Sequence, residues 1–138
     1  MEEYFQTKIH LSSVYRSEPV ELTEQPWFFN QVARIEPEDK ILPTQTLQLL
    51  KKIEKKMGRQ PGVRYGPRLI DLDLLLFKNW VLESSFLTVP HPKMEERAFV
   101  LMPLLELDPN IVNPRTNQKF RDVFEEKKDL LSFCERIP

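Results

Sequence analysis

The sequence has few of the residues that build redox and metal sites: of its 138 residues, one is cysteine and two are histidine. Cys134 has no partner for an internal disulfide, and with two separated histidines it cannot complete the tetrahedral ligand set of a structural zinc site. The start, MEEYFQTKIH, lacks the basic residues and the apolar stretch of a signal peptide. The longest apolar run, VLMPLLEL, is far shorter than a bilayer span. These absences predict a cytoplasmic protein without a membrane partner.

Glycine is also scarce, and three glycines leave little material for a glycine-rich phosphate cradle. Neither GxxxxGKS/T nor GxGxxG occurs, so side chains would have to hold any phosphate groups. The GxSxG elbow of serine hydrolases is absent as well. Lys and Arg total 20 against 21 Asp and Glu, and a net charge of -1 gives no overall field that attracts nucleic acid. The sequence therefore predicts no nucleic-acid partner.

Three segments have the composition of β-strands. Residues 7–15 and 28–35 are rich in β-branched and aromatic side chains, and a loop with two prolines separates them. Residues 69–77, LIDLDLLLF, form an apolar run that is too short for a surface helix. They predict a buried central strand, and residues 81–84 predict a shorter strand after it.

Three further segments predict helices. In residues 44–57 apolar side chains recur every three or four positions, and Gly58 suits the carboxyl end of a helix. Residues 96–107 predict a helix that contains a proline, and residues 120–137 predict an amphipathic helix at the C-terminus. Strands and helices do not alternate regularly, and no repeat or linker divides the chain. We therefore expect a single α+β domain over residues 1–138.

Asp71 and Asp73 are the first candidates for chemistry. Side chains two apart on a strand project from the same face, so the two carboxylates would lie about 7 Å apart. Magnesium is usually held by one or two carboxylates, with water and phosphate oxygens in its other positions. The pair predicts phosphoryl-type transfer, although pairing with Arg64 or Arg68, or a solvated edge position, accounts equally well for a bare DxD.

Cationic residues flank these aspartates, both in the loop RQPGVRYGPR and in the segment that follows. Arginine suits phosphate recognition because it can offer two donors at once. Taken singly, each arginine is more often a solvated surface residue, and His91 between two prolines could simply hydrogen-bond a turn. The cluster as a whole predicts recognition of a nucleotide–metal complex, and its members are Arg59, Arg64, Arg68, His91 and Arg97.

An aromatic run, Trp27, Phe28 and Phe29, comes directly before Asn30. Alternate positions of a strand must face inward, so such rings belong to the core by default. An aromatic face beside an amide can also hold a flat heterocycle, because the ring stacks and the amide fixes its orientation.

Residues 64–75, RYGPRLIDLDLL, resemble the signature RWGPRxxDxDLL of the hydroxymethyldihydropterin pyrophosphokinase family. The similarity continues on both sides. SSVYRSEPV and QPWFFNQV resemble the family's SSxYxTEPV and QPxFLNxV, and LTVPHPKMEERAFVLMPLLELDP resembles LxxPHPxxxxRxFVLxPLxExxP. The resemblance covers nearly everything from Ser12 to Pro109.

This resemblance implies a folate-biosynthesis enzyme that transfers the β,γ-diphosphoryl group of ATP to the hydroxymethyl group of 6-hydroxymethyl-7,8-dihydropterin and releases AMP. The implied fold is a ferredoxin-like antiparallel sheet with helices on one side. The implied catalytic residues are Arg59, Arg68, Asp71 and Asp73, with a pair of Mg²⁺ ions on Asp71 and Asp73. The implied pterin-binding residues are Ser17, Glu18, Val20, Phe28, Asn30 and Phe99. The implied ATP-binding residues are Lys51, Glu54, Arg64, Tyr65, Leu74, Thr88, His91 and Arg97.

The chain departs from the family pattern in a few places. Tyr65 replaces the more usual tryptophan, Phe86 stands where some relatives have arginine, and Glu21 stands where glycine is frequent. By the same comparison, the family's first strand and most of its first helix would precede Met1. We expect either a start further upstream or a replacement strand, which would make the protein a dimer instead of a monomer if a second copy supplied it.

Two other functions are open on the sequence alone. One is an inactive, truncated pterin- or nucleotide-binding remnant, which a missing first strand favours and the intact DxD disfavours. The other is an unrelated metal-dependent nuclease or phosphatase that uses the DxD, which leaves the QPWFFN and VPHP segments without a role.

Overall fold

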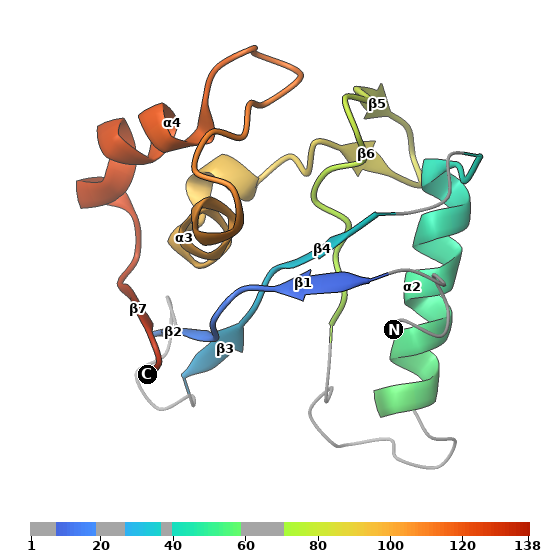
Figure 1. Cartoon of the computed structure of the whole chain (residues 1–138), viewed down its shortest axis with the longest axis horizontal. Helices are drawn as coiled ribbons and strands as arrows, with labels where there is room; N and C mark the ends of the chain where they lie inside the picture. Colours follow the sequence, from blue (N-terminus) through green and yellow to red (C-terminus); the bar gives the residue numbers. More distant parts are fainter. Residues whose placement is uncertain (1–7, 19–26, 37–39, 59–70) are drawn as a thin grey trace. The chain divides into compact units, whose positions relative to one another are not determined.

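The computed structural model describes residues 8–18, 27–36, 40–58 and 71–138. The chain divides into two compact units (Figure 1): unit 1 is Met1–Lys8 with Glu36–His91, and unit 2 is Ile9–Ile35 with Pro92–Pro138. Within the described residues, antiparallel ladders and separate helices make up both units, which confirms the predicted α+β class. The strands described form three small sheets instead of one. The single domain stays a prediction.

An antiparallel ribbon forms the first half of unit 2. In it, β1 (Ile9–Leu11) pairs with β4 (Ala33–Ile35), and β2 (Tyr15–Ser17) pairs with β3 (Phe28–Asn30). Figure 1 shows the two pairs following one another along the same two chain segments. The two strands predicted here are present, each divided in two, and Thr7 lies outside the described residues.

A β-bulge causes this division. Between the two ladders, residues 12–14 on one strand lie opposite only Gln31 and Val32 on the other. The buried Ser12 joins the two sides: its N–H donates to the Val32 carbonyl at 2.9 Å, and its Oγ accepts the Val32 N–H at 2.9 Å. Because one extra residue bends a ribbon and increases its twist, the bulge sets the direction in which β2 and β3 leave β1 and β4.

The C-terminus adds a third strand to the ribbon. Strand β7 (Cys134–Arg136) pairs antiparallel with β2 and gives the order β3-β2-β7. The predicted helix over residues 120–137 is therefore wrong beyond α4 (Phe120–Lys127), which is followed by the short η2 (Lys128–Leu130) and then by β7. The amphipathic pattern of residues 120–137 contains no information about the free edge of β2. Pairing with that edge satisfies the backbone N–H and C=O groups that a longer helix would have paired internally.

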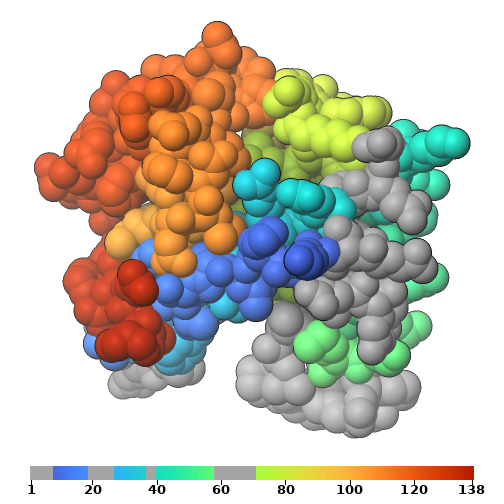
Figure 2. All heavy atoms as spheres, viewed as in Figure 1, coloured from blue at the N-terminus to red at the C-terminus, as the bar shows by residue number. Residues whose placement is uncertain are grey.

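Helices supply the core of unit 2. The short η1 (Met94–Glu96), α3 (Ala98–Leu107) and α4 pack against one another, and α3 also packs on β2. Figure 2 shows the side chains of α3 and α4 (orange to red) next to one another on the surface. Leu101 and Phe120 are fully buried between these elements. The helix predicted over residues 96–107 is confirmed from Ala98 onward.

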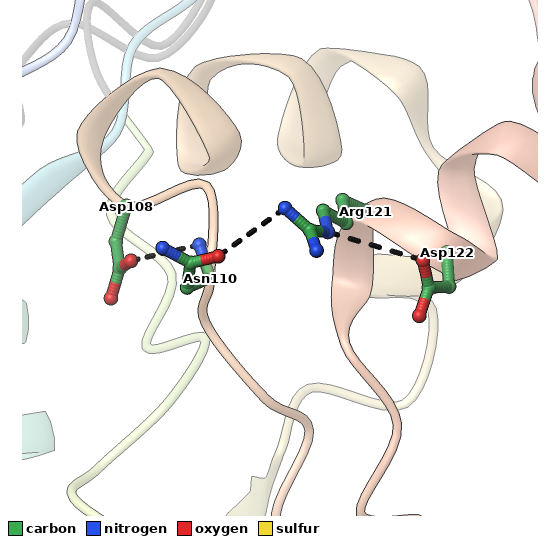
Figure 3. A network of polar contacts seen from close by, with 4 residues as sticks. All are labelled: Asp108, Asn110, Arg121 and Asp122. Carbon is green, nitrogen blue, oxygen red and sulfur yellow. Dashed lines mark hydrogen bonds and ion pairs between the residues drawn. The ribbon is translucent and has the colours of Figure 1, made fainter.

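Polar side chains fix the turn between α3 and α4 (Figure 3). Asp108 Oδ1 accepts the Asn110 N–H at 3.0 Å, and Arg121 on α4 donates to Asn110 Oδ1 at 3.3 Å. Arg121 also lies 4.0 Å from the Asp122 carboxylate. Each such surface contact stabilises little by itself, but together they hold the start of α4 beside the end of α3.

Unit 1 is built on α2 (Pro43–Gly58), which confirms the helix predicted from its periodic apolar residues. Its Leu50 and Ile53 are buried, while the four lysines between residues 51 and 56 are exposed. The hairpin of β5 (Leu82–Glu83) and β6 (Thr88–Val89) confirms the shorter strand predicted nearby. The core joins buried side chains to half-buried ones, and its members are Phe77, Leu87, Val89, Ile41, Leu47, Leu74 and Leu82.

The buried central strand predicted over residues 69–77 is not found in the part that the structure describes. Residues 71–77 form no assigned strand, and the backbone of this segment is bonded at separate points instead of along a ladder. His91 N–H donates to the Leu75 carbonyl at 2.8 Å, and Leu72 N–H donates to the Glu54 carboxylate at 3.1 Å. An apolar run predicts that a segment is buried, but it does not predict that another strand lies beside it. Without a neighbouring strand the segment cannot form a ladder.

Candidate functional site

The predicted site residues fall into two groups. In unit 2 the structure describes Ser17, Glu18, Phe28, Asn30, Arg97 and Phe99, and in unit 1 it describes Lys51, Glu54, Asp71, Asp73, Leu74, Thr88 and His91. The predicted Val20, Arg59, Arg64, Tyr65 and Arg68 lie outside the described residues.

Three members of the first group, Ser17, Phe28 and Asn30, lie on one face of the β2–β3 ladder. Ser17 lies opposite Phe28 and Tyr15 lies opposite Asn30, and side chains in opposite positions share a face. Tyr15 and Ser17 are buried because this face is the one on which α3 packs. Phe28 is 52% exposed, so its ring is open to a ligand at the margin of the packed surface.

Helix α3 presents Phe99 toward the same side. Phe99 and Glu106 are seven residues apart, which places them on one face of a helix about 10 Å apart along its axis. Glu106 is bonded to Tyr15 on β2 and to Ser13 just before it, so helical periodicity puts Phe99 on the side of α3 that carries this link. Phe28 and Asn30 lie on the ladder face on which α3 packs, and we refer to Phe28, Asn30 and Phe99 together as the aromatic pocket, the expected ligand site of unit 2.

Two charged residues border the aromatic pocket. The Arg97 guanidinium lies 5.6 Å from the centroid of the Phe99 ring, within the range of a cation–π contact. Glu18 directly follows β2 and is exposed. Strand alternation turns Glu18 toward the opposite face of the ladder from Ser17, so its backbone and not its carboxylate lies nearer the pocket.

Tyr15 and Glu106 were not predicted as site residues, yet they join the two walls of the pocket. The Tyr15 hydroxyl donates to Glu106 Oε1 at 2.9 Å, and the Ser13 N–H donates to Glu106 Oε2 at 2.6 Å. Burial raises the pKa of Tyr15 to about 12, and Glu106 adds to the shift through its hydrogen bond and charge. The Ser13 N–H holds the pKa of the Glu106 carboxyl below its usual value. The only sequence signal for this pair was a carboxylate inside the apolar run VLMPLLEL.

The Tyr15 pKa gives a testable pH dependence of stability. The native state keeps the phenol proton up to about pH 12, whereas the unfolded state loses it near 10, so the stabilisation from Tyr15 is complete below pH 10 and is lost between these values. We expect the difference in unfolding free energy between wild type and Tyr15→Phe to fall between pH 9 and pH 11 by about 1 kcal/mol. Urea unfolding of both proteins at the two pH values measures it, and an unchanged difference would contradict the assignment.

The second group surrounds the DxD segment in unit 1. Asp71 and Asp73 are exposed while Leu72 and Leu74 are half-buried, so the two carboxylates share the outer side of the extended chain as predicted. Glu54 from α2 accepts the backbone N–H of Leu72, the residue between them, at 3.1 Å. This bond fixes the DxD segment to the helix.

Glu54 is notable for its environment. Its carboxylate is buried, and Oε1 accepts no hydrogen bond from the residues that the structure describes, although the Lys51 ammonium lies 3.3 Å away. The Lys51 ammonium offsets the charge of this buried carboxylate. The predicted nucleotide residues Lys51 and Glu54 thus form an ion pair in which Lys51 is exposed and Glu54 is buried.

The remaining predicted residues of unit 1 lie next to the same segment. Leu74 packs against Leu87 and Val89, which flank Thr88 on β6. His91 is bonded through its backbone to Leu75. The structure therefore brings Leu74, Thr88 and His91 to one side of unit 1.

The carboxylates fit a magnesium ion in donor type and number. No group of three or more His, Cys, Asp or Glu that could hold a metal occurs among the described residues. Magnesium does not require such a cage, because one or two carboxylates with water and substrate phosphates complete its octahedron. Two exposed carboxylates on one side of an extended segment meet this requirement.

The chain matches known proteins over most of its length. A family model described as 7,8-dihydro-6-hydroxymethylpterin-pyrophosphokinase (HPPK) matches residues 1–109. A 2-amino-4-hydroxy-6-hydroxymethyldihydropteridine pyrophosphokinase of Aquifex aeolicus is 36% identical over 134 residues, which cover 97% of this chain and 81% of that protein. The protein of the same name from Bacillus subtilis is 37% identical over 131 residues, covering 92% of this chain and 77% of the relative.

A third relative is much longer than this chain. The folic acid synthesis protein fol1 of Schizosaccharomyces pombe is 40% identical over 117 residues, which cover 85% of this chain but 16% of that protein. The chain therefore corresponds to one segment of such relatives. Among the described residues, none of the helices is both long and apolar enough to cross a membrane.

The α+β class of the described residues agrees with the family match, and together they define the class as pyrophosphokinases. The chain belongs to the 7,8-dihydro-6-hydroxymethylpterin-pyrophosphokinase family. The resemblance seen in the sequence is thereby confirmed, and with it the assignment to the pyrophosphokinases of folate synthesis.

Proposed function

We propose that this chain transfers the β,γ-diphosphoryl group of ATP to the hydroxymethyl oxygen of 6-hydroxymethyl-7,8-dihydropterin and releases AMP. The observation that carries the proposal is the aromatic pocket of unit 2, where Phe28 and Asn30 share the ladder face that meets the Phe99 face of α3. Two rings can stack on a flat pterin, and an amide offers both a donor and an acceptor to its polar edge. Ser17, Glu18 and Val20 would complete the pocket.

Most of the proposed nucleotide contacts belong to unit 1. Lys51 and Glu54 on α2, with Leu74, Thr88 and His91 beside the DxD segment, would bind ATP. The other proposed ATP contacts are Arg64, Tyr65 and Arg97. Arg59 and Arg68 are proposed as catalytic cations that neutralise phosphate charge.

Asp71 and Asp73 would hold a pair of Mg²⁺ ions. When bound, the metal would offset the phosphate charge and help align donor and acceptor. The chain itself contributes positioning: Glu54 fixes the DxD backbone, and Phe28 with Phe99 orients the heterocycle and keeps water from it. Both carboxylates are exposed. A cytoplasmic location is also part of this proposal.

The test is AMP release by the 138-residue chain supplied with ATP, Mg²⁺ and 6-hydroxymethyl-7,8-dihydropterin. We expect AMP only when pterin and magnesium are both present. ATP hydrolysis without pterin would favour a metal-dependent phosphatase. Pterin binding by equilibrium dialysis without AMP formation would favour an inactive remnant, and the absence of both in a folded protein would contradict the proposal.

A further inference from the structure

Glu106 is bonded to the ribbon at the point where the bulge ends and β2 begins. Its Oε2 accepts the N–H of Ser13, which lies in the bulge at residues 12–14, and its Oε1 accepts the hydroxyl of Tyr15, the first residue after the bulge. An extra residue in a bulge leaves backbone groups outside the ladder, so an acceptor from elsewhere must replace the missing partner. One carboxylate on α3 therefore fixes both the bulge and the strand that follows it.

Both walls of the aromatic pocket depend on this attachment. Tyr15 lies opposite Asn30 in the ladder, and the next pair of that face places Ser17 opposite Phe28. On the other side, Glu106 and Phe99 lie on one face of the same helix, two turns apart. Glu106 thus ties the helix that carries Phe99 to the ladder that carries Phe28, at a point outside both residues.

The geometry points to Glu106 as a positioning residue that sets the width of the aromatic pocket by fastening the bulge and Tyr15 to α3. This inference rests on the proposed function, because it gives the pocket a pterin ligand. It adds a residue that does not touch the substrate and that acts through Phe28, Asn30 and Phe99. A stacked heterocycle requires a fixed spacing between its two rings, and a small displacement of one wall weakens binding without unfolding the protein.

The two hydrogen bonds to Glu106 determine which variants can test this inference. Two donors converge on Glu106, and a carboxylate has an acceptor oxygen for each. In Glu106→Ala both bonds are lost. In Tyr15→Phe only the hydroxyl bond is lost, and the bond from Ser13 remains. Glu106→Gln can keep both contacts, because its amide oxygen can accept the Ser13 N–H and its NH₂ group can donate to the Tyr15 hydroxyl oxygen. The matched control is Glu125→Ala, which removes an exposed carboxylate of α4 that pairs with Lys128.

The experiment measures pterin and nucleotide affinity separately for each variant, by fluorescence titration with the pterin and with a non-hydrolysable ATP analogue plus Mg²⁺. We expect Glu106→Ala and Tyr15→Phe to weaken pterin binding about tenfold and to leave nucleotide binding within about twofold. Glu106→Gln and Glu125→Ala should match wild type within about twofold. Amide exchange at Ser13 should accelerate in Glu106→Ala and not in Glu125→Ala.

Three outcomes decide the inference. Loss of pterin affinity alone, with faster exchange at Ser13, supports it. Equal weakening of pterin and nucleotide would show a general loss of structure and overturn it, as would unchanged pterin affinity in folded variants. If wild type itself binds no pterin, the proposed function fails first, which is a different result from normal wild-type binding with unaffected variants.

Discussion

Replacing either aspartate of the DxD with asparagine should reduce pterin-dependent AMP formation more than about a hundredfold, because each carboxylate is a proposed metal ligand and even groups that only support such ligands contribute 10- to 100-fold. Asp71 and Asp73 are both exposed, and no described residue could replace them as part of a larger metal cluster. The expected readout is kcat/KM for ATP as a function of Mg²⁺ concentration. The variants should need more magnesium as well as turn over more slowly.

The control for these variants is Asp129→Asn, an exposed aspartate in η2 of unit 2. It should retain wild-type kinetics. All three proteins should unfold within about 0.5 kcal/mol of wild type, since surface substitutions away from packed or capped positions have small effects. Asp71→Asn or Asp73→Asn with more than a third of wild-type activity at ordinary magnesium would overturn the metal assignment.

The helix and strands that depend on neighbouring residues in the sequence could be predicted from the spacing and composition of those residues. The helix α2 follows from apolar side chains every three or four positions, and its core residues Leu50 and Ile53 are the ones that the pattern turns inward. The strands near residues 9–17 and 28–35 follow from β-branched and aromatic composition. In the DxD segment, the alternation of exposed aspartates with half-buried leucines was also predictable, even though the segment is not a ladder strand.

Contacts between distant parts of the chain could not be predicted in this way. The C-terminal residues form β7 because β2 offers its edge, and these strands are more than a hundred residues apart in the sequence. The bulge at residues 12–14 depends on the register of two ladders, which composition does not determine. Glu106 in VLMPLLEL was predicted only as part of a helix, because its partners Ser13 and Tyr15 are more than ninety residues away.

The resemblance to a family supplied what the patterns could not. From the sequence alone Phe28 and Asn30 were either core residues or a ligand surface, and the structure shows them on the face that meets α3, with Phe28 half exposed. That placement supports the pterin assignment for this pair. The same cannot be said of Arg59, Arg64 and Arg68, whose roles rest on the resemblance and remain proposals.

Phe28→Ala should weaken pterin binding about ten- to a hundredfold, since stacking of a flat heterocycle on an aromatic side chain contributes about 1–3 kcal/mol. The neighbouring Phe29 provides a closely matched control. It is the next residue of the same strand, is 65% exposed, and lies opposite Arg16 on the other face of the ladder. Phe29→Ala should leave pterin affinity within about twofold of wild type, and neither variant should change the affinity for an ATP analogue.

A second substitution separates stacking from general packing. Phe28→Leu keeps an apolar side chain of similar bulk and removes the aromatic face, so it should resemble Phe28→Ala in pterin affinity and wild type in thermal stability. Equal losses of pterin affinity in Phe28→Ala and Phe29→Ala would show that both act through the ribbon and not through the ligand. In that case the aromatic pocket would lose its proposed role, because the two faces of one strand cannot both contact a ligand held against α3.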